Sequence, residues 1–263
     1  RIPAAWNNLV GLKTTATYLS TKGVLPLCSG FDTVGPLTNS VTDASLAVSI
    51  MAGETPQLPE EKPISQCRFL VNKTAVLDDL ASEQSNAFQK AIDDLAKAGA
   101  TIEYAELDCF NDIQPLGPVL FPYEAWASWG DKISASPGTV FEPVENRFLS
   151  GKDITHAQYT EAWEAMLKLR ETYNAQTTDY DAVLAPTMCI NPPNVEELLA
   201  DVELFQQNNI LALRNTRFGN MFGLCALTIP TQSPACGLMV SAKPFGEKDL
   251  VSVGLSIEKV LGP

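Results

Sequence analysis

The fold of this chain is decided by its first 36 residues, RIPAAWNNLVGLKTTATYLSTKGVLPLCSGFDTVGP (residues 1–36). Proline and glycine recur throughout the stretch, and short apolar runs separate them. A long segment of this kind inside a compact protein is usually part of a functional site. The stretch starts with Arg-Ile-Pro, without an initiator Met or a signal peptide. We therefore expect it to continue a domain that begins further upstream.

The composition is that of a globular protein with a sizeable core. The chain has 263 residues, of which 45% are hydrophobic and 19% are charged. This length accommodates one large domain or two small ones. The apolar runs are far shorter than the roughly 20 residues of a transmembrane helix, so we expect no membrane association. With 18 basic and 31 acidic residues, the net charge is −13, which predicts no direct binding of nucleic acid.

The cysteines and the single histidine limit the chemistry that the chain can perform. None of the six cysteines belongs to a C-x-x-C motif, and most lie in apolar runs. This favours buried, reduced thiols in a cytoplasmic protein over disulfides or a metal site. His156 follows Thr155 at the start of a polar helical turn, which indicates a solvated side chain. We therefore expect no catalysis by histidine, no metal and no cofactor.

Strands and helices alternate along the rest of the sequence. A strand at 68–71, a helix that Ser82 caps and Gly99 ends, and a strand at 101–107 form a β-α-β pattern. Such a unit predicts a parallel or mixed sheet within one α/β domain. The other predicted elements are helices at 38–53, from 155 onward, at 195–223 with a break near Gly219 or Gly223, and at 247–260, and strands at 181–186, 224–230 and 237–242.

With these segments in order, the opening resembles the downstream half of the signature of the amidase signature family. There the pattern runs roughly G-G-S-[IV]-R-x-P-A, then V-G-L-K-P-T, then D-x-x-G-P and V-x-D. This chain matches it in order and spacing at Arg1, Pro3, Ala4, Val10, Gly11, Leu12, Lys13, Thr15, Ser20, Gly23, Pro26, Asp32, Gly35, Pro36, Val41 and Asp43. Four later segments are also similar to the family: residues 151–162, 180–187, 219–231 and 236–250.

Five positions depart from the pattern. Thr14 replaces a proline, Gly30 replaces a serine, and Asn39 replaces an arginine. Thr17 and Tyr18 stand where the family often has Gly-Arg. The resemblance implies an α/β fold with a mixed central sheet flanked by helices on both faces. It also implies that residues 1–263 form the C-terminal portion of a single amidase signature domain, truncated at the N-terminus.

The resemblance places the catalytic residues before this chain. Enzymes of the family use a serine nucleophile, a second serine in a cis peptide and a lysine base. The nucleophile would stand two residues before Arg1, and the rest of the triad would be earlier still. Lys13 matches the lysine of V-G-L-K, outside the triad, and we expect it to be a packed or surface residue.

Some residues of the chain would still surround the active site. Arg1 would follow the nucleophile and pair with a carboxylate that orients the loop. Asp32, followed by Thr33, would fix the loop by accepting backbone N–H bonds. Four further residues would line the acyl pocket, unless they are ordinary core: Tyr123, Trp126, Thr187 and Met188.

The implied function is the hydrolysis of a small-molecule carboxamide to a carboxylate and ammonia. The partner of the chain would be the missing N-terminal half of the domain, and the chain alone would be inactive and prone to association, a homodimer included. One alternative is the A subunit of an amidotransferase that acts on misacylated tRNA with partner subunits. Another is a non-catalytic binding or scaffold protein made from this half-fold, with exposed strand edges.

Overall fold

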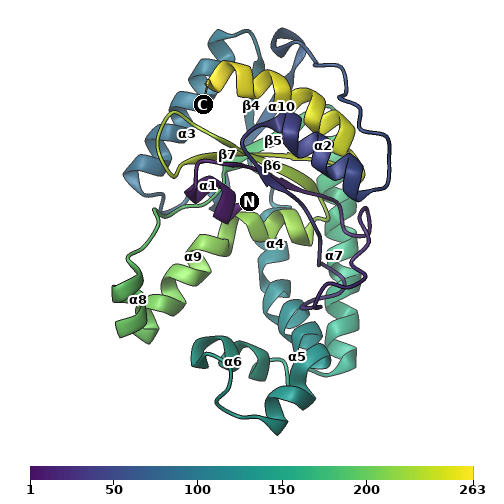
Figure 1. Ribbon diagram of the computed structural model, residues 1–263, viewed down its shortest axis with the longest axis vertical. Coiled ribbons are helices and arrows are strands. Elements are labelled where there is room, and N and C mark those ends of the chain that lie inside the picture. The colour runs from purple at the N-terminus through teal and green to yellow at the C-terminus, as the bar shows by residue number, and fades with distance from the viewer. Residues whose placement is uncertain (263) are drawn as a thin grey trace.

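A mixed seven-stranded sheet forms the centre of the protein, in a computed structural model that describes residues 1–262 (Figure 1). The strand order is β2-β1-β6-β7-β5-β3-β4. The strands are β1 (Val10–Lys13), β2 (Leu37–Thr38), β3 (Arg68–Asn72), β4 (Thr101–Ala105), β5 (Ala182–Pro186), β6 (Cys225–Pro230) and β7 (Gly237–Ala242). β3 runs parallel to β4 and β5, and the other pairs are antiparallel, which confirms the predicted mixed sheet.

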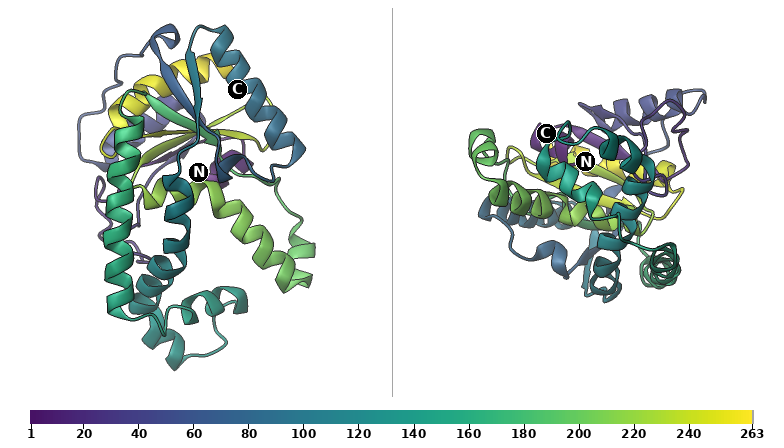
Figure 2. Two further views of the ribbon diagram at one scale, coloured as in Figure 1. Left: turned by 180° about the vertical axis from the view of Figure 1, so that it is seen from behind. Right: turned by 90° about the horizontal axis from the view of Figure 1, so that it is seen from below.

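Helices cover both faces of this sheet, and each face has its own hydrophobic core (Figure 2). The first core contains side chains of α2 (Val41–Met51), α3 (Ser82–Lys97) and α10 (Glu247–Leu261). The second contains side chains of α4 (Cys109–Ile113), α5 (Gly117–Ala135), α7 (His156–Thr177) and α9 (Val202–Met221). The other helices are α1 (Ile2–Trp6), α6 (Glu142–Leu149) and α8 (Val195–Ala200), with short 3-10 turns at Ile64–Gln66, Ala75–Leu77 and Gln114–Leu116.

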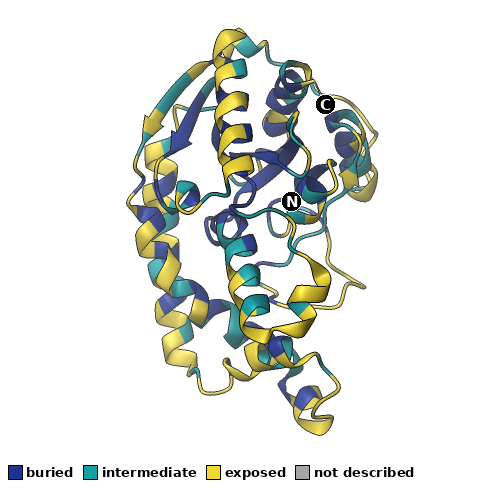
Figure 3. Cartoon of the chain, turned by 90° about the vertical axis from the view of Figure 1, so that its left-hand side faces the viewer, coloured by how far each residue is buried: buried dark blue, intermediate teal, exposed yellow. Residues whose placement is uncertain are grey.

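The three central strands have apolar sequences because both of their faces are covered. Every residue of β5, β6 and β7 is buried. Continuous apolar runs are typical of strands with helices packed on both sides. In contrast, α6, α8 and the first half of α9 project beyond the sheet and are largely exposed (Figure 3).

Two predicted helix starts are formed by side-chain caps, and one is not. The hydroxyl of Ser40 accepts a hydrogen bond from the Asp43 amide, and Thr155 forms a capping box with Gln158. The prediction that Ser82 caps α3 was wrong. Ser82 is the first helical residue, because Ala81 already has the extended backbone of the capping position.

Two predicted boundaries also differ from the structure. The strand predicted at 101–107 ends at Ala105, because its partner in β3 ends opposite, at Asn72. The break in 195–223 falls at Asp201, whose side chain caps α9 by accepting from the Leu204 amide. Gly219 lies inside α9, so it does not interrupt the helix.

The six cysteines are buried, as predicted, and none of them is joined to another in a disulfide. Burial raises the pKa of Cys28 and of Cys225 to about 12, so both thiols are protonated at neutral pH. Among residues 1–262, no helix combines the length and the apolar character that crossing a bilayer requires.

Candidate active site

Arg1 is enclosed between the C-terminal part of α9 and strand β7. Its guanidinium donates a hydrogen bond to Oδ1 of Asn220 at 2.7 Å and lies 3.7 Å from Sδ of Met239. Burial lowers the pKa of the Arg1 side chain to about 10. Gly219 makes room for this group, since a Cβ there would lie 2.5 Å from a guanidinium nitrogen. We expected Arg1 to pair with a carboxylate, but the neutral amide of Asn220 accepts its hydrogen bond.

Lys13 is buried beside the same end of α9. Its side-chain nitrogen donates to the carbonyl oxygens of Thr14 at 2.9 Å and Leu224 at 2.8 Å. Burial, reinforced by the charge of Arg1, lowers the pKa of Lys13 to about 7. Lys13 is therefore a packed lysine, and its hydrogen bonds go to main-chain carbonyls and not to a hydroxyl group.

Arg170 is a third cation at the C-terminal end of α9. Its Nε donates to the carbonyl oxygen of Met221, the last residue of α9, at 2.6 Å. The C-terminal end of a helix attracts cations, because its last carbonyls carry a partial negative charge. Within residues 1–262, none of Arg1, Lys13 and Arg170 forms an ion pair with a carboxylate.

Two carboxylates hold the loop that leads from β1 to β2. Asp32 accepts hydrogen bonds from the backbone amides of Leu27 at 2.8 Å and Cys28 at 3.1 Å. Glu124 of α5, which is only 8% exposed, accepts from the Gly30 amide at 2.7 Å and the Tyr159 hydroxyl at 2.9 Å. The sequence analysis missed Glu124. The signal was available, because it is a lone acid among apolar and aromatic residues in F-P-Y-E-A-W.

The glycine at position 30, where the family pattern has a serine, follows from these contacts. A Cβ on Gly30 would lie 2.7 Å from a carboxylate oxygen of Glu124 and 2.7 Å from the indole ring of Trp163. Trp163 in turn stacks on Phe31, with ring centroids 5.2 Å apart. A larger residue at position 30 would therefore displace both the carboxylate and the indole ring.

The pocket residues expected from the sequence lie in two separate regions. On α5, the Tyr123 hydroxyl is 3.1 Å from Nδ1 of His156, and Trp126 lies against Gly130. At the end of β5, the Thr187 hydroxyl is 2.6 Å from that of Thr228, and the next residue, Met188, is fully buried. Thr33 lies partly exposed in the loop beside Asp32.

We expect Glu124→Leu to lower the free energy of unfolding by about 2–3 kcal/mol, because it leaves the Gly30 amide and the Tyr159 hydroxyl without their acceptor. Tyr159→Phe removes one of these two hydrogen bonds and should cost about 1 kcal/mol. Urea denaturation of both variants measures the difference. Equal losses for the two variants would show that the carboxylate does not hold the loop.

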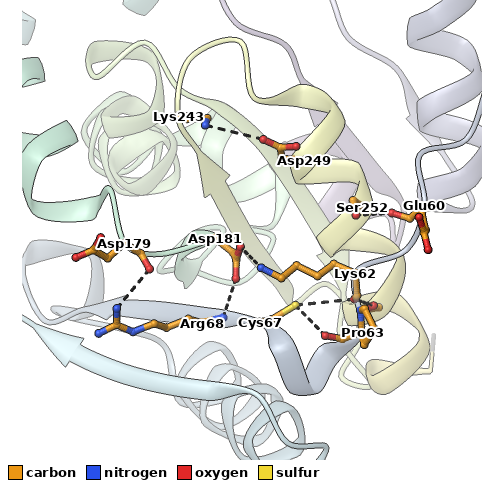
Figure 4. Close-up of polar contacts among 11 residues, drawn as sticks. Glu60, Lys62, Pro63, Cys67, Arg68, Asp179, Asp181, Lys243, Asp249 and Ser252 are labelled. Carbon is orange, nitrogen blue, oxygen red and sulfur yellow. Dashed lines mark hydrogen bonds and ion pairs between the residues drawn. The ribbon is translucent and has the colours of Figure 1, made fainter.

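A groove with a volume of about 600 Å³ opens where β5 begins and β7 ends. Figure 4 shows Lys62 reaching Asp181, with the two charged atoms 2.5 Å apart, and Asp181 also accepting from the backbone amide of Arg68. The lining of the groove includes Tyr173, Val183 and Ser241.

These three residues of the groove also line a second, smaller cavity. Its wall continues to Gly219 and Met239, which flank the Arg1 side chain. The groove lies at the end of the sheet, between α7 and α10, and the cavity that it borders reaches the Arg1 site.

Comparison with known proteins identifies the family. The family model described as Amidase matches residues 1–251. A 2-amino-5-chloromuconic acid deaminase of Comamonas testosteroni is 28% identical over 273 residues, covering 100% of this chain and 58% of the relative. The A subunit of a glutamyl-tRNA(Gln) amidotransferase from Sulfurisphaera tokodaii is 25% identical over 303 residues, covering 99% of this chain and 62% of the relative.

A solved structure shows the same fold. A crystal structure of an amidase matches with a TM-score of 0.84 and 24% identity, covering 100% of this chain and 60% of that one. The chain thus belongs to the amidase family, as its opening residues predicted. It spans about three fifths of the length of the relatives that it matches.

Proposed function

We propose that the intact protein is an amidase that hydrolyses the C–N bond of a carboxamide and releases a carboxylate and ammonia. The observation that carries this proposal is the family match over residues 1–251, which includes the signature segment that begins at Arg1. The enclosed position of Arg1 supports it, because the nucleophile would stand two residues earlier and so close to this buried cluster of cations.

In this proposal, residues 1–263 are the C-terminal portion of one domain, and the triad lies upstream. The serine oxygen attacks the carbonyl carbon, and the second serine relays its proton to the lysine. The proton then passes to the leaving nitrogen, which departs as ammonia. Water hydrolyses the acyl ester by the same relay and frees the carboxylate. Backbone N–H groups of the glycine-rich loop stabilise the oxyanion that forms in each step.

Lys13 takes no part in this relay, because its amine is bonded to two main-chain carbonyls. The part of this chain is instead to position the segment around the nucleophile. Arg1 is fixed by α9, and the loop from 20 to 36 is fixed by Asp32 and Glu124. A cytoplasmic location, suggested by the six unpaired cysteines, belongs to the same proposal.

A second candidate function is that of the A subunit in a tRNA-dependent amidotransferase. The likeness to the protein from Sulfurisphaera tokodaii favours it. Such a protein would release ammonia to a partner chain, so purification from the source cell would yield a stable complex with a second chain. An amidase of the first kind would purify without one.

The proposal is tested by extending the chain upstream. We expect the codons before Arg1 to encode Gly-Gly-Ser-Ile, and the extended protein to release ammonia from simple carboxamides. Replacing that serine by alanine should abolish the activity, while residues 1–263 alone should show none. A different upstream sequence, or ammonia release by residues 1–263 alone, would refute the proposed arrangement.

A further inference from the structure

The short helix α1 lies directly against the backbone of the central sheet. Its residues Ala4 and Ala5 have no exposed surface. A Cβ on Gly11 of β1 would lie 2.7 Å from Cβ of Ala4, and a Cβ on Gly237 of β7 would lie 2.7 Å from Cβ of Ala5. Two carbon atoms in contact are normally at least about 3.5 Å apart. No side chain therefore fits between α1 and these two glycines.

Two threonine hydroxyl groups lie beside this contact. Thr228 of β6 pairs with Gly11, and its methyl group would be 3.2 Å from a Cβ there. A Cβ on Gly237 would lie 2.5 Å from the hydroxyl oxygen of Thr228 and 2.9 Å from that of Thr187. The two oxygens are hydrogen-bonded to each other at 2.6 Å, and the Thr187 amide donates to the Gly237 carbonyl at 2.9 Å.

The hydrogen bond between the two hydroxyl groups sets how closely these strands and α1 approach. Oxygen atoms come within 2.6 Å only because a hydrogen atom is shared between them. A methyl group in place of either hydroxyl would need a separation of about 3.5 Å, roughly 1 Å more. That space is bounded by Gly237, which is in turn in close contact with Ala5. The hydroxyl pair therefore determines the height of α1 above the sheet.

This arrangement is complete within the present chain. Thr187 and Thr228 have no exposed surface, so residues that precede Arg1 can add neighbours around the pair but cannot touch its enclosed atoms. The sequence predicted that Thr187 lines the acyl pocket, unless it is ordinary core. Its hydroxyl group is instead bonded to another side chain of the sheet.

The position of α1 also fixes the chain that leads to the nucleophile. The carbonyl of Arg1 accepts a hydrogen bond from the Ala5 amide at 2.9 Å, so Arg1 is held by the first turn of the helix. Its Cα would lie 3.5 Å from a Cβ on Gly11. The proposed nucleophile stands two residues earlier, within about 7 Å along the chain. A shift of α1 would therefore be transmitted to the nucleophile.

We propose that Thr187 and Thr228 are positioning residues, whose hydroxyl pair holds α1 at the height that places the nucleophile for attack on the amide carbon. The inference rests on the proposed amidase function. Reacting atoms must lie about 3–3.5 Å apart, and a misplacement of about 1 Å can cost roughly a hundredfold in rate. Neither hydroxyl touches the substrate, so the binding of the amide does not depend on them.

The test compares valine and serine at both positions in the extended protein. Valine puts a methyl group in the place of the hydroxyl, whereas serine keeps the hydroxyl. Thr187→Val and Thr228→Val should each lower kcat for ammonia release from butyramide by about tenfold or more, with KM within about twofold of the parent value. Thr187→Ser and Thr228→Ser should keep kcat within about threefold, because the hydrogen bond remains.

Thr177→Val is the matched control. It removes a partly buried hydroxyl group that donates to the Tyr173 carbonyl within α7, a helix that does not carry the nucleophile. It should leave kcat within about twofold of the parent value. Thr187→Ala removes a hydroxyl without adding bulk, so it keeps the test available if a valine variant does not fold. It should lower kcat more than Thr187→Ser does, because α1 loses its support.

Three outcomes would overturn the inference. The first is an unchanged kcat in both valine variants, and the second is an equal loss of kcat in the valine and serine variants. The third is a loss of activity that is expressed as a higher KM, which would show that the threonines contact the substrate. Urea denaturation of each variant establishes that the assayed protein is folded.

Crystal structures of the extended protein separate this inference from the proposed function. In Thr228→Val, α1 should lie about 1 Å farther from β6 than in the parent protein, while Thr228→Ser should leave it in place. If α1 moves in this way and the parent protein releases no ammonia from any carboxamide, the role of the hydroxyl pair stands and the amidase function fails. If the parent protein is active and Thr228→Val keeps both the position of α1 and kcat, the function stands and the positioning role fails.

Discussion

Gly35→Ala should lower the free energy of unfolding by at least about 3 kcal/mol, which is the cost of severe overpacking in a core. A Cβ at this position would lie 1.9 Å from the carbonyl oxygen of Leu12 and 3.0 Å from its carbonyl carbon. These are backbone atoms of β1, which pairs with β6 opposite Leu227, so they cannot move aside without breaking the sheet. Urea denaturation followed by circular dichroism measures the loss.

Gly117→Ala is the matched control for this prediction. The nearest atoms to a Cβ on Gly117 are 3.5 Å away, which is ordinary contact, and the residue lies in the first turn of α5. Alanine favours a helix more than glycine by up to about 1 kcal/mol, so this variant should be as stable as the parent chain or slightly more stable. Similar losses of stability in Gly35→Ala and Gly117→Ala would show that the close approach of residue 35 to β1 does not cause the destabilisation.

Lys13→Met should remove a component of the pH dependence of stability. The pKa of Lys13 is about 7 in the folded protein and about 10.4 in an unfolded chain. Between these values the unfolded state binds one more proton at this residue, so its contribution to stability increases with pH. The slope approaches about 1.4 kcal/mol per pH unit and vanishes below pH 7, where the lysine is charged in both states.

The difference in the free energy of unfolding between Lys13→Met and the parent chain isolates this contribution. The stability of the variant relative to the parent chain should be greatest at pH 6, where burial of the charged amine is costly. The gain should shrink steadily toward pH 9. Urea denaturation at pH 6, 7, 8 and 9 measures it, with the exposed Lys248→Met as control. If the difference in the free energy of unfolding between Lys13→Met and the parent chain does not change with pH, Lys13 has an ordinary pKa in the folded protein.

The central strands and the long helices could be predicted because their signals are local. β5, β6 and β7 have apolar runs of strand length, and α7 begins with a capping box at Thr155. β1 and β2 could not be predicted in this way. β1 has four residues and includes a buried lysine, and β2 has only two residues. β1 pairs with β2, which directly precedes α2, and with the distant strand β6, so no local signal reveals either pairing.

The same distinction holds for the candidate site. The anchoring role expected of Asp32 follows from turn chemistry within a few residues, and the structure places its hydrogen bonds at Leu27 and Cys28. The acceptor for Arg1 is Asn220, from the far end of the chain, and no local pattern singles it out. Glu124 likewise acts on a loop about 90 residues earlier, which only the folded chain reveals.

The antiparallel pairing of β1 with β6 has a consequence for the order of folding. During synthesis the first strand of this chain emerges long before its partner, since Lys13 pairs with Ala226 and Leu12 with Leu227. Contacts this distant in sequence slow folding, and incomplete chains expose unpaired strand edges and apolar surface. The signature segment therefore reaches its final position only after β6 has left the ribosome. Assembly of the region around Arg1 is for this reason a late event in folding.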